Sequence, residues 1–258
     1  MSTELKLTLS ENASSFLTES LIYALAAEED AHKWKFAILN LIQSVELTLK
    51  DRLKEEHFSL VYVDPAKMQT TITTDQAIQR LRTIAGVEFT KEELEIVRCA
   101  RDWRNEIIHY EFKLSVEKVK SIYAALLGFL SYFHSVHGQG SIEWEVDKEL
   151  WKEAKSLLHS RERMLDAAKA KCKKENIQTA NLWVCRHCGN SYFNPSNHVC
   201  YACGHVEDVF QCEGCGKQLY LDSLEFRDSE YGGMKHLCRS CSMLFDPRGF
   251  GNIENIKG

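Results

Sequence analysis

The stretch CRHCGNSYFNPSNHVCYACG at residues 185–204 contains two Cys-x2-Cys pairs, and CEGCG at 212–216 and CRSCS at 238–242 supply two more. Zinc favours four thiolate ligands in a tetrahedron, and two cysteines separated by two residues on a tight turn provide half of such a site. We therefore predict two structural Zn2+ sites, each closed by four protein ligands. The predicted ligands are Cys185, Cys188, Cys200, Cys203, Cys212, Cys215, Cys238 and Cys241.

The spacing of the pairs leaves two ways of combining them. Consecutive pairing places 11 and 22 residues between the halves of the two sites, which suits the short hairpins of two zinc ribbons. Pairing the first with the third and the second with the fourth gives a cross-brace instead. We favour consecutive ribbons. A glycine, which tolerates positive φ, follows each of the first three pairs, whereas Ser242 follows the fourth. The histidines beside the pairs are expected to be bystanders; they are His187, His198, His205 and His236.

The composition is that of an ordinary soluble protein. The chain has 258 residues, of which 44% are hydrophobic and 27% charged, enough to bury a core without covalent links. No apolar run approaches the roughly 20 residues of a spanning helix, and the first ten residues lack the features of a secretory signal. We expect a cytoplasmic protein with no membrane partner. In that reducing compartment, ten cysteines favour metal binding over disulfides.

Before about residue 178 the pattern of apolar residues is helical almost throughout. The predicted fold is mainly α, with a helical bundle over residues 1–178 and a small tandem zinc-ribbon region of β-hairpins over 179–258. The predicted helices cover Phe16–Ala27, Ala31–His57, Gln76–Ile84, Thr90 to about Tyr110, Ser115 to the glycines at 138 and 140, and Ser141–Asn176.

The last predicted helix carries an apolar residue at every seventh position. The stripe consists of Trp144, Trp151, Leu158, Leu165 and Cys172. It either docks on the core of the bundle, which we favour, or pairs in part with a partner chain. Cys172 and Cys99, both within predicted helices, are expected to be buried small hydrophobes.

The segment RCARDWRNEIIHYEF at residues 98–112 is an amphipathic helix with a dense polar face. Arg98, Asn105 and His109 share that face, and Arg101 and Arg104 lie at its border. A histidine that titrates near neutral pH, beside arginines that hold phosphate, is what metal-free RNA cleavage requires.

Here the chain resembles the HEPN family, helical bundles whose signature is an arginine, four to six residues and a histidine. The matching residues are Arg104, followed by the polar Asn105, and His109. The resemblance covers roughly residues 16–176. It implies an endoribonuclease with Arg104 and His109 in the active site and Asn105 assisting, and in bacteria a toxin or antiviral effector. Arg52 and His57 have the same spacing, but apolar Leu53 follows Arg52.

The resemblance further implies a homodimer in which two copies of the motif meet. One His109 then acts as base and the other as acid, without a metal in catalysis. Arg98 and Arg101 are expected to help hold the RNA substrate, and Glu46 is a weaker candidate for orienting these groups. The alternative is a non-catalytic dimeric interaction protein whose ribbons bind a protein or a nucleic acid, with the arginines merely paired to nearby carboxylates.

The charge of the chain bears on how RNA is held. The formal charge is −5, and a divalent zinc held by four thiolates carries a net −2. Two such sites replace eight neutral cysteines, so the loaded chain carries about −9. Broad electrostatic capture of RNA is therefore disfavoured, and a substrate must be held locally by the arginines of the 98–112 segment.

Overall fold

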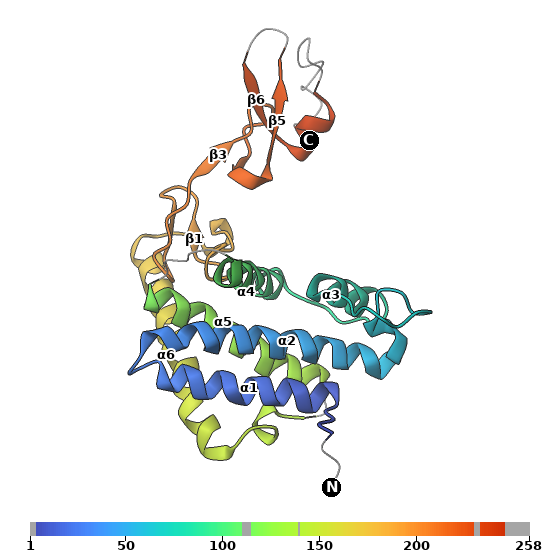
Figure 1. Ribbon diagram of the computed structural model, residues 1–258. Helices are drawn as coiled ribbons and strands as arrows, with labels where there is room; N and C mark the ends of the chain where they lie inside the picture. The colour runs from blue at the N-terminus through green and yellow to red at the C-terminus, as the bar shows by residue number, and fades with distance from the viewer. Residues whose placement is uncertain (1–3, 110–114, 139, 230–232, 246–258) are drawn as a thin grey trace.

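The computed structural model describes residues 4–109, 115–138, 140–229 and 233–245 (Figure 1). Most of this chain is helical, as predicted, and short antiparallel hairpins form its C-terminal part. The main helices are α1 (Leu9–Ala26), α2 (Trp34–Glu56), α3 (Thr74–Thr83), α4 (Lys91–His109), α5 (Val116–His137) and α6 (Lys148–Lys174). The hairpins pair β1 (Phe193–Asn194) with β2 (Val199–Cys200), β3 (Val209–Gln211) with β4 (Gln218–Tyr220), and β5 (Leu224–Asp228) with β6 (Met234–Cys238), and α7 (Arg239–Met243) follows.

The bundle is organised around α2. This helix packs along α1 and also contacts α3, α4 and α5, while α6 crosses α1 and α5. Its centre includes a buried polar contact in which the Ser20 hydroxyl lies 2.8 Å from both the Tyr123 hydroxyl and the Ala37 carbonyl. The aliphatic side chains around it are almost fully enclosed. None of the helices described is long and apolar enough to cross a membrane.

The last long helix begins later than the sequence indicated. Asp147 caps α6, its side chain accepting hydrogen bonds from the N–H groups of Glu149 and Leu150, both at 3.0 Å. Residues Ile142–Trp144 form a separate 3-10 turn, η3. Trp144 is consequently 79% exposed, whereas Trp151, inside the helix, is 4% exposed. The predicted start at Ser141 was wrong because the Asp147 cap starts a new helix.

The two hairpin regions are arranged differently relative to the bundle. The segment that contains β1 and β2 lies against the end of the bundle near α4, and the hairpins β3–β4 and β5–β6 extend away from it (Figure 1). Each strand pair is short, with two residues in β1 and five in β5. The backbone ladders alone therefore cannot hold this region together.

Candidate functional site

The eight predicted ligands form two groups of four cysteines, Cys185/Cys188/Cys200/Cys203 and Cys212/Cys215/Cys238/Cys241, in which all sulfurs lie within 4.8 Å of one another. We call them the first and the second cysteine group. The Cys185–Cys203 and Cys188–Cys200 sulfurs are each 3.8 Å apart. Tetrahedral zinc with Zn–S bonds of about 2.3 Å requires sulfurs about 3.8 Å apart. The predicted consecutive pairing is thus confirmed, and the cross-brace is excluded.

Three of the four Cys-x2-Cys turns share one backbone conformation. Gly189, Gly204 and Gly216 have φ of +70°, +72° and +72°. The N–H group of each glycine donates to the carbonyl of the first cysteine of its pair at 2.8 Å. The fourth turn is helical: Cys238 caps α7, and its sulfur accepts from the N–H group of Cys241 at 3.5 Å. A helical turn needs no positive φ, which explains why Ser242 is tolerated there.

The local environment shifts the thiol pKa values in both directions. Hydrogen bonds lower the pKa of Cys188, Cys200 and Cys212, whereas neighbouring sulfurs and burial raise the pKa of Cys185, Cys203, Cys215 and Cys241. The thiols of Cys185, Cys200 and Cys203 hydrogen-bond to the Cys188 sulfur and hold its pKa far below the usual value of a thiol. Burial raises the pKa of Cys212, but backbone N–H groups, including that of Cys238 at 3.1 Å, lower it to about 6. None of the described cysteines forms a disulfide. Four thiolates at tetrahedral spacing fit a soft divalent metal ion, held with no open coordination position.

The three predicted catalytic residues lie on the last turns of α4. Trp103 and Ile107, each 6% exposed, bury the opposite side of this helix in the core. Asn105 and His109 are exposed and Arg104 is half-buried. Within the described part of the chain, no hydrogen bond or ion pair engages these three side chains.

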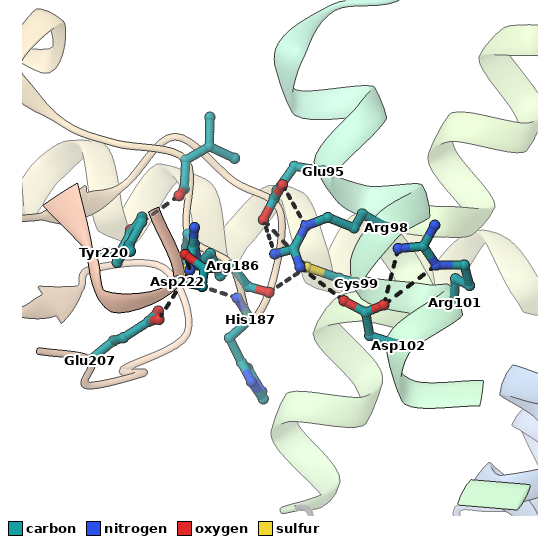
Figure 2. Close-up of polar contacts among 12 residues, drawn as sticks. Glu95, Arg98, Cys99, Arg101, Asp102, Arg186, His187, Glu207, Tyr220 and Asp222 are labelled. Carbon is teal, nitrogen blue, oxygen red and sulfur yellow. Dashed lines mark hydrogen bonds and ion pairs between the residues drawn. The ribbon is translucent and has the colours of Figure 1, made fainter. Parts of the chain in front are cut away.

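The two predicted substrate-binding arginines are engaged by carboxylates of the chain itself (Figure 2). Arg98 donates to Glu95 at 2.5 and 3.0 Å and to Asp102 at 2.8 Å. Hydrogen bonding to Glu95 raises the pKa of the Arg98 guanidinium. Arg101 pairs with Asp75 of α3 and, at 3.2 Å, with Asp102. These carboxylates compete with RNA phosphate for both arginines.

The side chains of the second Arg-x4-His match, Arg52 and His57, both contact neighbouring residues of the chain. Arg52 pairs with Glu56 at 2.8 Å and with Glu55 at 3.5 Å. His57 lies beyond the end of α2, and its ring accepts a hydrogen bond from the N–H group of Ser59 at 3.2 Å. Its environment differs from that of the match on α4, although the spacing in the sequence is identical.

Glu46 is engaged away from the α4 motif. Its carboxylate binds the Lys50 ammonium at 2.6 Å and accepts from the Thr74 hydroxyl at 3.4 Å, between α2 and α3. Lys50 is itself buried and also reaches Thr71 at 3.1 Å. These contacts give Glu46 a role in joining α2 to the segment that leads into α3.

Sequence reasoning missed how the first cysteine group meets α4. The Cys99 thiol donates to the carbonyl of Arg186 (Figure 2). The Trp103 ring lies 5.1 Å from the His187 ring. A Cβ on Gly189 would lie 2.4 Å from Cγ1 of Ile96. Cys99 is buried, as predicted, but it is also a hydrogen-bond donor. The sequence did hold one signal of this contact. The apolar stripe on α4 is wider than packing against the bundle alone requires, which indicates a second element on that helix.

Further contacts join the first group to α6. Arg161 donates to the side-chain oxygen of Asn190 at 2.8 Å, and the Asn190 amide donates to the Cys188 carbonyl at 3.1 Å. The Tyr201 hydroxyl donates to Glu175 at 2.5 Å. The first group is therefore fastened to two helices of the bundle.

The two cysteine groups are joined to each other through Arg186 and β4. The Arg186 guanidinium lies 4.2 Å from the centre of the Tyr220 ring and pairs with Asp222 (Figure 2). The Tyr220 hydroxyl donates to the Val184 carbonyl at 3.2 Å. Tyr220 also belongs to the small core around the first group.

Comparisons of the chain with protein-family models, with curated proteins and with solved structures find no match.

Proposed function

We propose that the chain is a metal-independent endoribonuclease of the HEPN type, active as a homodimer in the cytoplasm. The observation that carries this proposal is the state of Arg104, Asn105 and His109. They lie at the accessible end of a helix anchored in the core, and no group of the described chain occupies them. The match at Arg52 and His57, in contrast, is held by its neighbours. The family that the chain resembles implies a role as a toxin or antiviral effector.

The geometry of one helix favours a site shared by two subunits. Five residues of an α-helix rise about 7.5 Å and turn about 140°, so Arg104 and His109 flank a groove rather than touch. His109 takes the proton from a ribose 2′-hydroxyl, whose oxygen attacks the phosphorus. His109 of the partner subunit protonates the departing 5′-oxygen, and the Arg104 side chains stabilise the charge on the phosphate. The products are a 2′,3′-cyclic phosphate and a 5′-hydroxyl.

The metal has a structural role in this proposal. We infer that Zn2+ occupies both cysteine groups, since four thiolates close each site and leave no position for a reacting water. Each ion contributes on the order of 10 kcal/mol to folding a region with little core of its own. No step of the reaction involves the metal.

The test is RNA cleavage by the purified, zinc-loaded protein in a buffer without free Mg2+ or Zn2+. The variants are Arg104→Ala and His109→Ala, with Arg52→Ala and His57→Ala as matched controls. We expect the wild type and the controls to cleave, and the α4 variants to lose at least about 100-fold in rate. Circular dichroism must show that each zinc-loaded protein is folded.

Three outcomes would contradict parts of this proposal. Cleavage that survives in both Arg104→Ala and His109→Ala excludes the site. A monomer at micromolar concentration excludes the shared-site mechanism. The absence of cleavage of any RNA supports the second candidate function, a non-catalytic dimeric protein that binds partners through its ribbons.

One observation favours that second candidate. The region around the second cysteine group exposes large apolar side chains, which is typical of a contact surface for another protein. They are Phe226 (45% exposed), Met234 (56%), Met243 (77%) and Leu244 (62%).

A further inference from the structure

The residues of the first metal-binding turn are the same residues that contact α4. Arg186, His187 and Gly189 lie between or directly after the ligands Cys185 and Cys188. Through them the turn accepts the Cys99 thiol, covers Trp103 and presses its backbone against Ile96. The conformation of this turn therefore decides whether the contacts with α4 exist.

Besides a metal, hydrogen bonds of Asn190 with the Cys188 carbonyl and the Cys185 N–H group hold the turn, together with the contacts of Arg186 with Tyr220 and Asp222. The strands β1 and β2 have two residues each, and the enclosed core around them consists largely of the cysteines themselves. Loss of the ion from such a site unfolds the segment that it organises.

The covered face of α4 includes buried apolar side chains. Ile96 is 4% exposed, Cys99 2% and Trp103 6%, and the turn supplies part of this cover. Removing the turn exposes them to water, which costs about 25 cal/mol for each Å2 of apolar surface. Trp103 directly precedes Arg104 on α4. Exposing it therefore destabilises the helix that presents the candidate catalytic residues.

The second cysteine group provides an internal contrast. It connects to the first group through Tyr220 and Asp222. No hydrogen bond, ion pair or ring contact between described residues joins its four ligands to α4. Three of the four ligands are buried in each group, but the fourth is exposed in the second group (Cys215) and half-buried in the first (Cys203).

We propose that metal binding at the first cysteine group, and not at the second, holds α4 in its folded position, so that this metal site controls the presentation of Arg104 and His109. The link to activity rests on the proposed ribonuclease function. The link between metal and helix stands on the contacts of Cys99, Trp103 and Ile96 alone.

The experiment compares two double variants of the full chain loaded with Zn2+. Cys200→Ser/Cys203→Ser removes ligands of the first group that do not themselves contact α4, and Cys212→Ser/Cys215→Ser is the matched control. Each variant should retain one metal ion per chain by mass spectrometry, against two for the wild type. Hydrogen exchange of the peptide covering residues 91–109 should accelerate at least about tenfold in the first variant and remain unchanged in the second. Peptides of α1 and α2 serve as the reference.

A third variant covers the case in which the first one does not fold. His187→Ala keeps all eight ligands and removes the ring that covers Trp103, so two metal ions remain and exchange in α4 rises severalfold. Unchanged exchange in α4 in whichever of these variants folds would overturn the proposal. Equal acceleration in the Cys212→Ser/Cys215→Ser protein would overturn its selectivity. RNA cleavage is measured in parallel, and a wild type without any cleavage refutes the ribonuclease function while the exchange result still decides the link between metal and helix.

Discussion

At the scale of single residues, two glycines of the first cysteine group share one backbone conformation but differ in how much space a side chain would have. Gly189 and Gly204 have nearly the same positive φ, and each follows a Cys-x2-Cys pair of the first group. Around Gly204 a Cβ would meet nothing within 4 Å, whereas at Gly189 it would collide with Ile96 of α4. The sequence pattern at the two positions is identical, and only the neighbouring helix separates them.

We therefore expect Gly189→Ala to cost more stability than Gly204→Ala. A left-handed alanine costs about 1–2 kcal/mol at either position. At Gly189 the collision adds roughly 1–3 kcal/mol, because the backbone of α4 or of the turn must shift. Urea unfolding of the zinc-loaded proteins measures the difference. Equal losses would show that the turn does not press against α4.

The pH dependence of stability involves His134, which lies 3.7 Å from Glu145. Burial lowers the pKa of this imidazole below its ordinary 6.5, although Glu145 and Asp51 oppose the shift. The unfolded chain then binds more protons than the folded one below about pH 6.5, so acidification destabilises the fold.

We expect the His134→Gln variant to lose less stability than the wild type between pH 7.5 and 5.5. The direction of the difference follows from the lowered pKa of His134. Urea unfolding at the two pH values measures it, and loss of zinc at the lower pH affects both proteins alike. A larger loss in the variant would contradict the lowered pKa.

At the scale of elements, the Asp147 cap divides the stripe of apolar residues at every seventh position, because α6 begins after Trp144. Trp151 falls inside α6 and is buried in the core, whereas Trp144 precedes the helix and is exposed. The stripe is thus core-facing at Trp151, and Trp144 is free to contact a partner chain. Regular spacing in the sequence does not distinguish the two tryptophans.

Trp151→Ala should cost about 3–5 kcal/mol of stability, because it empties a buried site. Trp144→Ala should change stability by less than about 0.5 kcal/mol. Thermal or urea unfolding gives both values, and sedimentation of the Trp144→Ala protein tests for a partner contact. A weakened dimer in that variant would support pairing of a second chain at this position.

At the scale of the whole molecule, the two cysteine groups differ in how far the bundle covers them. The first group is covered by α4 and α6, whereas the second projects from the bundle with Cys215 exposed (Figure 1). A site whose ligands reach solvent opens more often than one whose opening also breaks contacts with the bundle.

A chelator in excess should therefore remove zinc in two phases, with the second group about tenfold faster or more. That ratio corresponds to about 1.4 kcal/mol in the barrier. The colour change of a metallochromic chelator measures both phases. The Cys212→Ser/Cys215→Ser protein should lack the fast phase, and its persistence there would assign the rapid loss to the first group.

The sequence by itself determined the features that depend on neighbours along the chain. Ligand spacing in the four Cys-x2-Cys pairs sets the two metal-binding groups, and the helical period of apolar residues sets most helices, since both depend on local geometry. The exposure of Asn105 and His109 followed from the same periodicity. The start of α6 was missed because the Asp147 cap competed with a periodic pattern that continued through it.

Only the tertiary structure decided which of these features meet. Arg101 pairs with Asp75, which is 26 residues away in the sequence. The Cys99 thiol donates to the carbonyl of Arg186, which is 87 residues away. Such contacts depend on how whole elements pack, and every polar residue on a helix face has several partners that are compatible with its sequence. For the same reason the first cysteine group packs against the bundle, while the second, also of four cysteines, extends away from it.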